Sequence, residues 1–80
     1  MLASLLARLR RARGLTQEQL GEAIGAGQTG VSNIECRRQG VSAPTLSRWL
    51  DAVSASDNER LEALRLASAE GQSSDLQGAA

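Results

Sequence analysis

The amino-acid sequence predicts an all-α fold in which five short helices share one hydrophobic core. Apolar residues recur at helical spacing in five successive segments, and capping or stop residues separate these segments. No segment shows the alternation of apolar and polar residues that indicates a β-strand. The length of 80 residues suits one small domain. We predict this domain over residues 1–70 and a disordered tail of small and polar residues over 71–80.

The first predicted helix carries a stripe of leucines at spacings of three and four residues, namely Leu2, Leu5, Leu6 and Leu9. It ends at Gly14, after a cluster of arginines that suits a helix C-terminus. An arginine-rich start without acidic residues is also typical of a mitochondrial presequence. Because the stripe continues into the next motif and a small core needs it, we interpret the segment as a core helix.

Capping residues place the next two helices. Thr16 and Gln19 form a capping box that opens the second helix, and Gly25 ends it. The third helix is predicted from about Gln28 to Glu35, with Gly27 as its cap.

The last two helices follow an exposed loop over residues 36–41. Ser42 caps the fourth helix and Pro44 lies in its first turn, where proline is tolerated. Trp49 belongs to the apolar stripe of this helix and is predicted to fill the core. Ser56 and Glu59 form the capping box of a fifth helix that runs to about residue 69.

Leucines point in more than one direction on the fifth helix. Leu61 and Leu64 share one face, whereas Leu66 points about 140° away from Leu61 at 3.6 residues per turn. One face can cover the core. Leu66, together with Ala63, is therefore a candidate for contact with a second subunit.

The composition excludes most kinds of catalytic and metal site. The chain has no histidine, lysine or tyrosine. It therefore lacks the residue types that most acid–base pairs, nucleophile assemblies and metal-ligand sets require. We expect no enzyme activity, no metal and no cofactor. Cys36 is the single cysteine, and we expect an inert thiol in a reducing compartment. No apolar run approaches the roughly 20 residues that cross a bilayer, so no membrane association is expected.

The formal net charge of zero conceals two oppositely charged halves. Residues 1–50 hold seven arginines against three acidic residues, whereas residues 51–80 hold two arginines against six. A basic first half indicates a side that faces a polyanion, and an acidic second half indicates a separate role. A single aromatic residue is too few for stacking on single-stranded nucleic acid.

The segment over residues 17–35 has the pattern of two helices that cross through a short turn. Gly21 is small enough to lie at the crossing, and Gly25 can adopt the positive φ of the turn. Apolar residues occupy the inward positions of both helices. The outward positions of the third helix are polar: Gln28, Thr29, Ser32 and Asn33.

These residues carry a resemblance to a known family. The string GLTQEQLGEAIG, followed by VSNIE and a capped helix with TLSRWLDAV, resembles a Cro/CI-type helix-turn-helix domain, also called the xenobiotic-response-element type. The resemblance runs from about Leu5 to Ala55, and the continuation to residue 68 is similar to the N-terminal domains of actinobacterial regulators. It implies a compact five-helix, lambda-repressor-like domain of bacterial or phage origin, associated with the nucleoid in the cytoplasm. It also implies a homodimer on palindromic double-stranded DNA.

The resemblance assigns roles to individual residues. The four polar residues of the third helix match the positions that contact base edges in the major groove. Gln17 matches a phosphate contact at the start of the second helix, and further phosphate contacts are expected from Arg13, Arg37 and Arg38. Arg10 is a further candidate for phosphate, but in the family this position commonly pairs with the one that Glu35 occupies, which would make Arg10 structural.

The glycines of the turn raise two further questions. Residues 25–30 match the dinucleotide-binding pattern G-x-G-x-x-G, but that pattern requires a preceding strand, so we interpret the match as accidental. Gly30 lies inside the third helix, where glycine costs about 1 kcal/mol relative to alanine. It either narrows sequence recognition or permits a closer approach to DNA.

Two functional hypotheses follow from the sequence. The first is a sequence-specific DNA-binding transcriptional regulator, acting as a repressor and a homodimer. The second is a protein-interaction module, such as an antitoxin, whose acidic C-terminal half binds a partner protein.

Overall fold

The computed structural model describes residues 1–69, and the regular structure over this range is entirely α-helical. This confirms the predicted all-α fold and its five helices. They are α1 (Leu2–Ala12), α2 (Gln17–Ile24), α3 (Gly27–Glu35), α4 (Ala43–Ala52) and α5 (Asp57–Ala69). The tail predicted over residues 71–80 lies outside the described residues.

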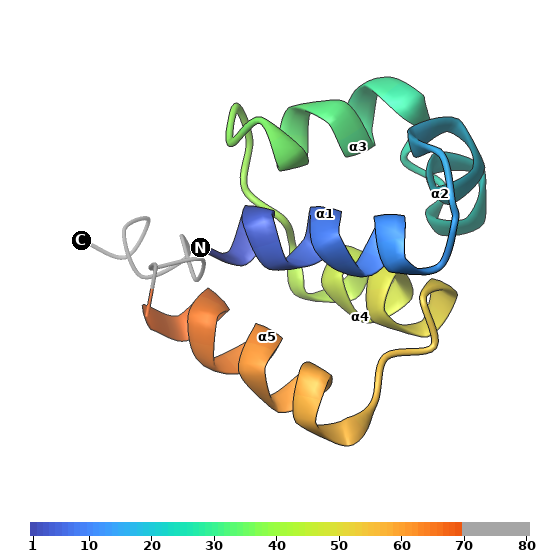
Figure 1. The fold of residues 1–80 in the computed structure, drawn as a ribbon. Helices are drawn as coiled ribbons and strands as arrows, with labels where there is room; N and C mark the ends of the chain where they lie inside the picture. The colour runs from blue at the N-terminus through green and yellow to red at the C-terminus, as the bar shows by residue number, and fades with distance from the viewer. Residues whose placement is uncertain (70–80) are drawn as a thin grey trace.

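Helix α1 occupies the middle of the domain, with α3 on one side and α5 on the other (Figure 1). Helix α2 packs against both α3 and α4. The four leucines at the start of α1 are buried, so this helix is part of the core, as expected. At the centre lies Trp49, which is fully buried and donates a hydrogen bond from Nε1 to the carbonyl oxygen of Leu6 at 3.2 Å. Its polar atom is therefore satisfied inside the core.

The predicted capping residues begin the helices. Thr16 and Gln19 form the capping box of α2, and the side chain of Ser42 accepts a hydrogen bond from the backbone N–H of Thr45 in α4. Ser56 and Glu59 exchange hydrogen bonds at the start of α5, at 2.8 and 3.2 Å. These side chains satisfy backbone N–H groups that have no partner within their helices.

Helix α3 begins one residue earlier than predicted. Gly27 is its first residue and Ala26 is the N-cap, without a capping side-chain hydrogen bond, so the prediction of Gly27 as the cap is wrong. Gly27 has a φ of 72°, which favours glycine. The residues that precede the glycine-rich turn belong to α2 rather than to a strand, as our interpretation of the dinucleotide-binding pattern requires.

The structure also corrects the orientation of α5. Ala63 is fully buried, and Leu66 and Ala67 are partly buried against the core. Leu61 and Leu64 lie on the outside, with 59% and 56% of their surface exposed. Ala63 therefore has no surface left for contact with a second subunit, so that part of the prediction is wrong, whereas the contact through the partly buried Leu66 stays a prediction.

No helix over residues 1–69 has the length and apolar character needed to span a bilayer.

Candidate nucleic-acid interface

The crossing of α2 and α3 depends on two glycines, as predicted. Gly25 ends α2 in the left-handed conformation with a φ of 76°. A Cβ atom on Gly21 would collide with the carbonyl carbon and oxygen of Gly27, and it would lie 2.7 Å from the backbone nitrogen of Gln28. The backbone of α2 thus touches the first turn of α3, and only glycine fits at the contact.

Helix α3 has one buried and one polar face. Val31 and Ile34 are buried in the core. On the other side, Gln28 and Thr29 are exposed, and the remaining two polar residues of the predicted set, Ser32 and Asn33, are half-buried. None of the four side chains forms a hydrogen bond with another residue in the range 1–69. Their donors and acceptors are therefore available to a ligand that lies against α3.

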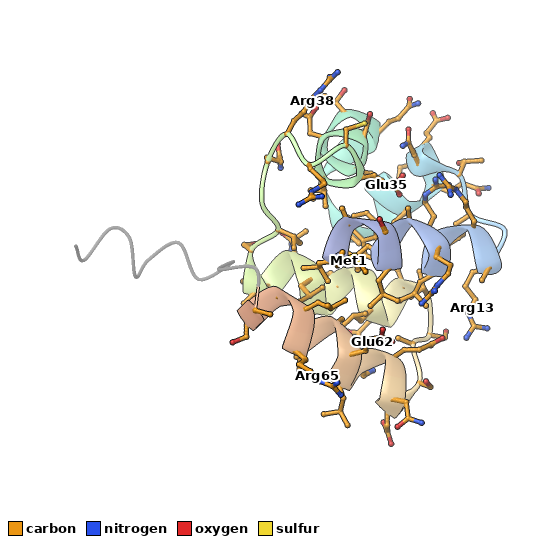
Figure 2. The ribbon with its side chains drawn as sticks, turned by 60° about the vertical axis from the view of Figure 1, so that its left-hand side comes forward. Met1, Arg13, Glu35, Arg38, Glu62 and Arg65 are labelled. Carbon is orange, nitrogen blue, oxygen red and sulfur yellow. The ribbon has the colours of Figure 1, made fainter. Side chains whose placement is uncertain are left out.

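A buried polar network fixes the C-terminal end of α3. The expected ion pair is present: Arg10 Nε lies 2.6 Å from Glu35 Oε2, and Arg10 Nη2 lies 3.1 Å from Glu35 Oε1. Arg10 Nη1 also donates to the carbonyl oxygen of Leu15 at 2.8 Å. Gln17 Nε2 donates to Glu35 Oε1 at 3.0 Å, so Glu35 links α3 to both α1 and α2. Figure 2 shows Glu35 between α3 and α1.

The network alters the acidity of Glu35. Burial alone raises the pKa of this carboxyl group, because it penalises the charged form. The hydrogen bonds from Arg10 and Gln17, together with the positive charges of Arg10 and Arg11, outweigh burial and hold the pKa below its ordinary value. Glu35 is therefore an anion at neutral pH, which suits its role as the acceptor of the network.

Two of the residues predicted to contact phosphate form hydrogen bonds inside the domain. Gln17 is held by Glu35. Arg13 Nη2 donates to the carbonyl oxygen of Ser54 at 3.1 Å, at the turn between α4 and α5. Figure 2 shows Arg13 and Arg38 at opposite sides of the domain. The structure thus brings Arg37 and Arg38 to the end of α3 but does not bring Arg13 there.

Arg11 is a cation that the sequence analysis did not select. It is exposed on α1, and its charge is close enough to Glu35 to lower the pKa of that carboxyl group. Its position directly after Arg10, whose side chain reaches α3, is the signal in the sequence that could have identified it.

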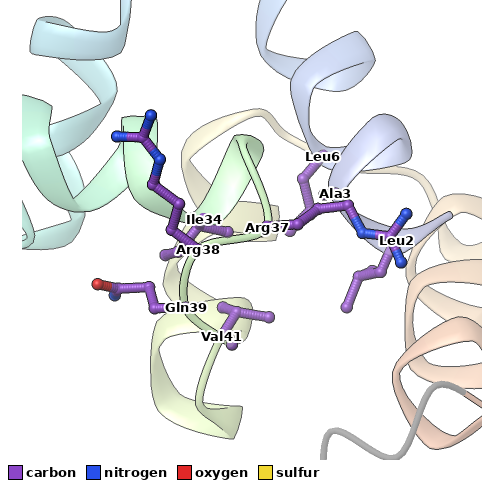
Figure 3. Close-up of a pocket in the computed structure, with 9 residues that line it drawn as sticks. Leu2, Ala3, Leu6, Ile34, Arg37, Arg38, Gln39 and Val41 are labelled. Carbon is purple, nitrogen blue, oxygen red and sulfur yellow. The ribbon is translucent and has the colours of Figure 1, made fainter.

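The two arginines of the loop after α3 point in different directions. Figure 3 shows Arg37 extending across a cavity toward Leu2 and Ala3, whereas the guanidinium group of Arg38, which also lines the cavity, points away from these two residues. The cavity has a volume of about 280 Å³. Its apolar lining comes from the start of α1, the end of α3 and the following loop: Leu2, Leu6, Ile34 and Val41. The stem of Arg37 covers apolar surface, and both arginines are exposed to solvent.

Glycine at position 30 avoids a steric clash within the helix-turn-helix. A Cβ atom at this position would lie 2.9 Å from the Cβ atom of Ala26, in the turn before α3. This geometry provides a packing reason for the glycine that does not involve DNA.

The family comparison agrees with this geometry. Residues 1–64 match a family model described as a helix-turn-helix domain. The match covers most of the chain, and the chain belongs to this family. Helix-turn-helix domains bind DNA by placing their second helix in the major groove, and they serve in transcription regulation. Comparisons with curated proteins and with solved structures give no match.

Proposed function

We propose that the protein is a sequence-specific regulator of the Cro/CI type that acts as a repressor and binds a palindromic operator as a homodimer. The observation that carries the proposal is the outer face of α3. Its polar side chains, Gln28, Thr29, Ser32 and Asn33, lack partners within residues 1–69 and stand on a helix that glycine contacts and a buried network hold in place. Glutamine and asparagine can each bind adenine through two hydrogen bonds, and threonine can contact the methyl group of thymine.

Arginines beside α3 supply the affinity for the DNA backbone in this proposal. Arg37 and Arg38 are exposed in the loop after α3, and Arg11 is exposed on α1 within electrostatic range of Glu35 at the end of α3. Contacts from these cations to phosphates strengthen binding to every sequence alike, because phosphates carry no base information. Arg13 donates a hydrogen bond to Ser54 and Gln17 donates one to Glu35. To contact phosphate, each side chain must break this hydrogen bond or share it with the phosphate.

Selection of bound duplexes from a random pool at about 150 mM salt tests the proposal. We expect one pseudo-palindromic site. The double variant Gln28→Ala with Asn33→Ala should lose the preference and retain nonspecific binding. Arg38→Ala should weaken binding to all duplexes similarly and reduce the dependence of affinity on salt. Arg65→Ala, which removes an exposed arginine of α5 on the other side of α1 from α3, is the matched control. A folded protein that selects no sequence would contradict the proposal.

The second candidate function is a protein-interaction module that uses the acidic C-terminal half. The exposure of Leu61 and Leu64 on α5 favours it, because apolar side chains at a surface can mark a binding site. Purification from the native source at endogenous levels tests this candidate. A stoichiometric complex that dissociates when Leu61 and Leu64 are both replaced by serine would support it. A protein that purifies alone would oppose it.

A further inference from the structure

The cavity between the start of α1, the end of α3 and the following loop is large enough for a small organic molecule (Figure 3). Its volume is about 280 Å³, whereas an apolar cavity of about 150 Å³ already holds benzene. Exposed residues 37–40 line one part of it, so the cavity reaches the surface. The rest of its lining is buried and apolar: Leu2, Ala3, Leu6, Ile34 and Val41. A ligand can therefore enter from solvent and lie against apolar side chains.

Positive charge predominates around this cavity. The guanidinium groups of Arg37 and Arg38 form no hydrogen bond or ion pair with another residue in the range 1–69. Helix α1 contains no acidic residue, and Glu35 is the only one between the start of α3 and Val41. The carboxylate of Glu35 is already bound by Arg10. An anion in the cavity would therefore meet two available cations, and the segments that line the cavity would present no unpaired carboxylate to it.

We propose that this cavity binds a small aromatic monocarboxylate, with its ring against the apolar lining and its carboxylate held by Arg37 and Arg38. A guanidinium group matches the geometry of a carboxylate through two parallel hydrogen bonds. The stem of Arg37 already extends across the cavity, which also allows its guanidinium group to lie over an aromatic ring. An apolar body with a few polar contacts that fix its orientation is the usual chemistry of a small-molecule site.

The lining selects this class of ligand over simpler ones. An inorganic anion could bind the two arginines but would gain nothing from the buried leucines, whereas a neutral hydrocarbon would leave both cations without a partner. A rigid ring also loses less conformational freedom on binding than a flexible chain of the same volume. The combination of an apolar ring and one negative charge therefore uses both parts of the cavity.

Occupation of the cavity would affect DNA binding, because the proposed function assigns the same two arginines to phosphates. A carboxylate bound by Arg37 and Arg38 competes with phosphates for these cations. The ligand should therefore weaken binding to every duplex alike, and DNA should weaken binding of the ligand by the same factor. This consequence rests on the proposed function, whereas binding of the ligand to the free protein does not.

Titration of the full, isotope-labelled chain with 2-naphthoate, followed by amide NMR shifts, tests the site without DNA. We expect saturable shifts at Ala3 and Val41 with a dissociation constant of roughly 100 μM. Naphthalene-2-carboxamide keeps the ring without the charge, and acetate keeps the charge without the ring. Each should bind at least about tenfold more weakly than 2-naphthoate.

Variants separate the contributions of the charges and of the cavity. Arg37→Gln and Arg38→Gln should each weaken binding of 2-naphthoate by about tenfold and leave the carboxamide unaffected. Ala3→Leu fills the cavity without changing the charge and should abolish binding of both ring compounds. Arg65→Gln, which removes an exposed arginine of α5, is the matched control and should have no effect. Circular dichroism establishes that each variant is folded, and the arginine variants test the site even if Ala3→Leu does not fold.

The outcomes distinguish failure of this inference from failure of the proposed function. No saturable shift up to about 10 mM 2-naphthoate, or equal binding by the wild type and the variant that lacks both loop arginines, would overturn the inference. Equal affinity for acetate would show nonspecific anion binding and would also overturn it. Saturating 2-naphthoate should weaken duplex binding by about tenfold, for preferred and scrambled sequences alike, which supports both proposals. Ligand binding by a wild type that selects no DNA sequence would defeat the proposed function alone.

Discussion

Helices α3 and α5 lie on opposite sides of α1 and differ in what holds them (Figure 1). Helix α3 is fixed at its start by a backbone contact at Gly21 and at its end by the network around Glu35. Helix α5 is held on the core chiefly by small or partly buried side chains, Ala63, Leu66 and Ala67. The outer face of α3 is polar, whereas that of α5 exposes two leucines. The helix that would read DNA is thus held rigidly, and the other presents an apolar patch.

The largest expected effect is the loss of the contact that positions α3. Gly21→Ala would place a methyl group against the backbone of Gly27 and Gln28, which cannot move without displacing α3. We expect a loss of about 3 kcal/mol in the free energy of unfolding, at the upper end of the cost of overpacking. Urea unfolding measures it. Glu22→Ala, at an exposed position of α2, is the control, and equal stability of the two variants would show that the crossing can widen.

A smaller loss of stability is expected when the charge of Glu35, at the C-terminal end of α3, is removed. Glu35→Gln keeps the shape but leaves Arg10, whose side chain is 11% exposed, without a counter-ion. We expect a cost of about 2 kcal/mol at neutral pH, since the pair is largely buried. Glu22→Gln is the control for loss of an exposed carboxylate.

The ion pair of Arg10 and Glu35 also predicts that the stability of the domain depends on pH. The pKa of Glu35 is lower in the folded protein than in the unfolded chain, so its contribution is complete above the ordinary pKa of 4.5. That contribution is lost as the pH falls through the lowered folded value. The stability difference between the wild type and Glu35→Gln should therefore shrink on acidification below about 4.5. A difference that stays constant from neutral pH to pH 3 would show that the charge of Glu35 does not stabilise the fold.

Substitutions on α5 should distinguish its two faces. Leu66→Ala should cost about 1–2 kcal/mol, because Leu66 is partly buried against the core. Leu61→Ala should cost less than about 0.5 kcal/mol, because its surface is already exposed. Both are measured by urea unfolding. An equal cost for the two variants would contradict the orientation of α5.

The sequence predicted the helix-turn-helix more accurately than α5 for a physical reason. The crossing of α2 and α3 requires glycine at Gly21 and Gly25, and such requirements are visible as residue types at fixed offsets. Helix α5 has leucines on several sides, so its pattern does not specify which face is buried. The sequence also did not reveal hydrogen-bond partners that lie far apart along the chain. No residue pattern near Arg13 indicates that its side chain reaches the carbonyl oxygen of Ser54. The ion pair of Arg10 and Glu35 was expected only through resemblance to a family.

A small net change in stability is expected at Gly30, where two influences oppose each other. Gly30→Ala gains helix propensity of about 1 kcal/mol but brings a methyl group against Ala26. We expect a net change within about 1 kcal/mol of the wild type. Replacing Ala26 by glycine removes the opposing methyl group, so in that background Gly30→Ala should stabilise the domain by nearly the full propensity difference. A double-mutant cycle isolates this coupling. If the two substitutions are additive, the contact with Ala26 does not explain the glycine, and close approach to DNA becomes the better reason for its presence.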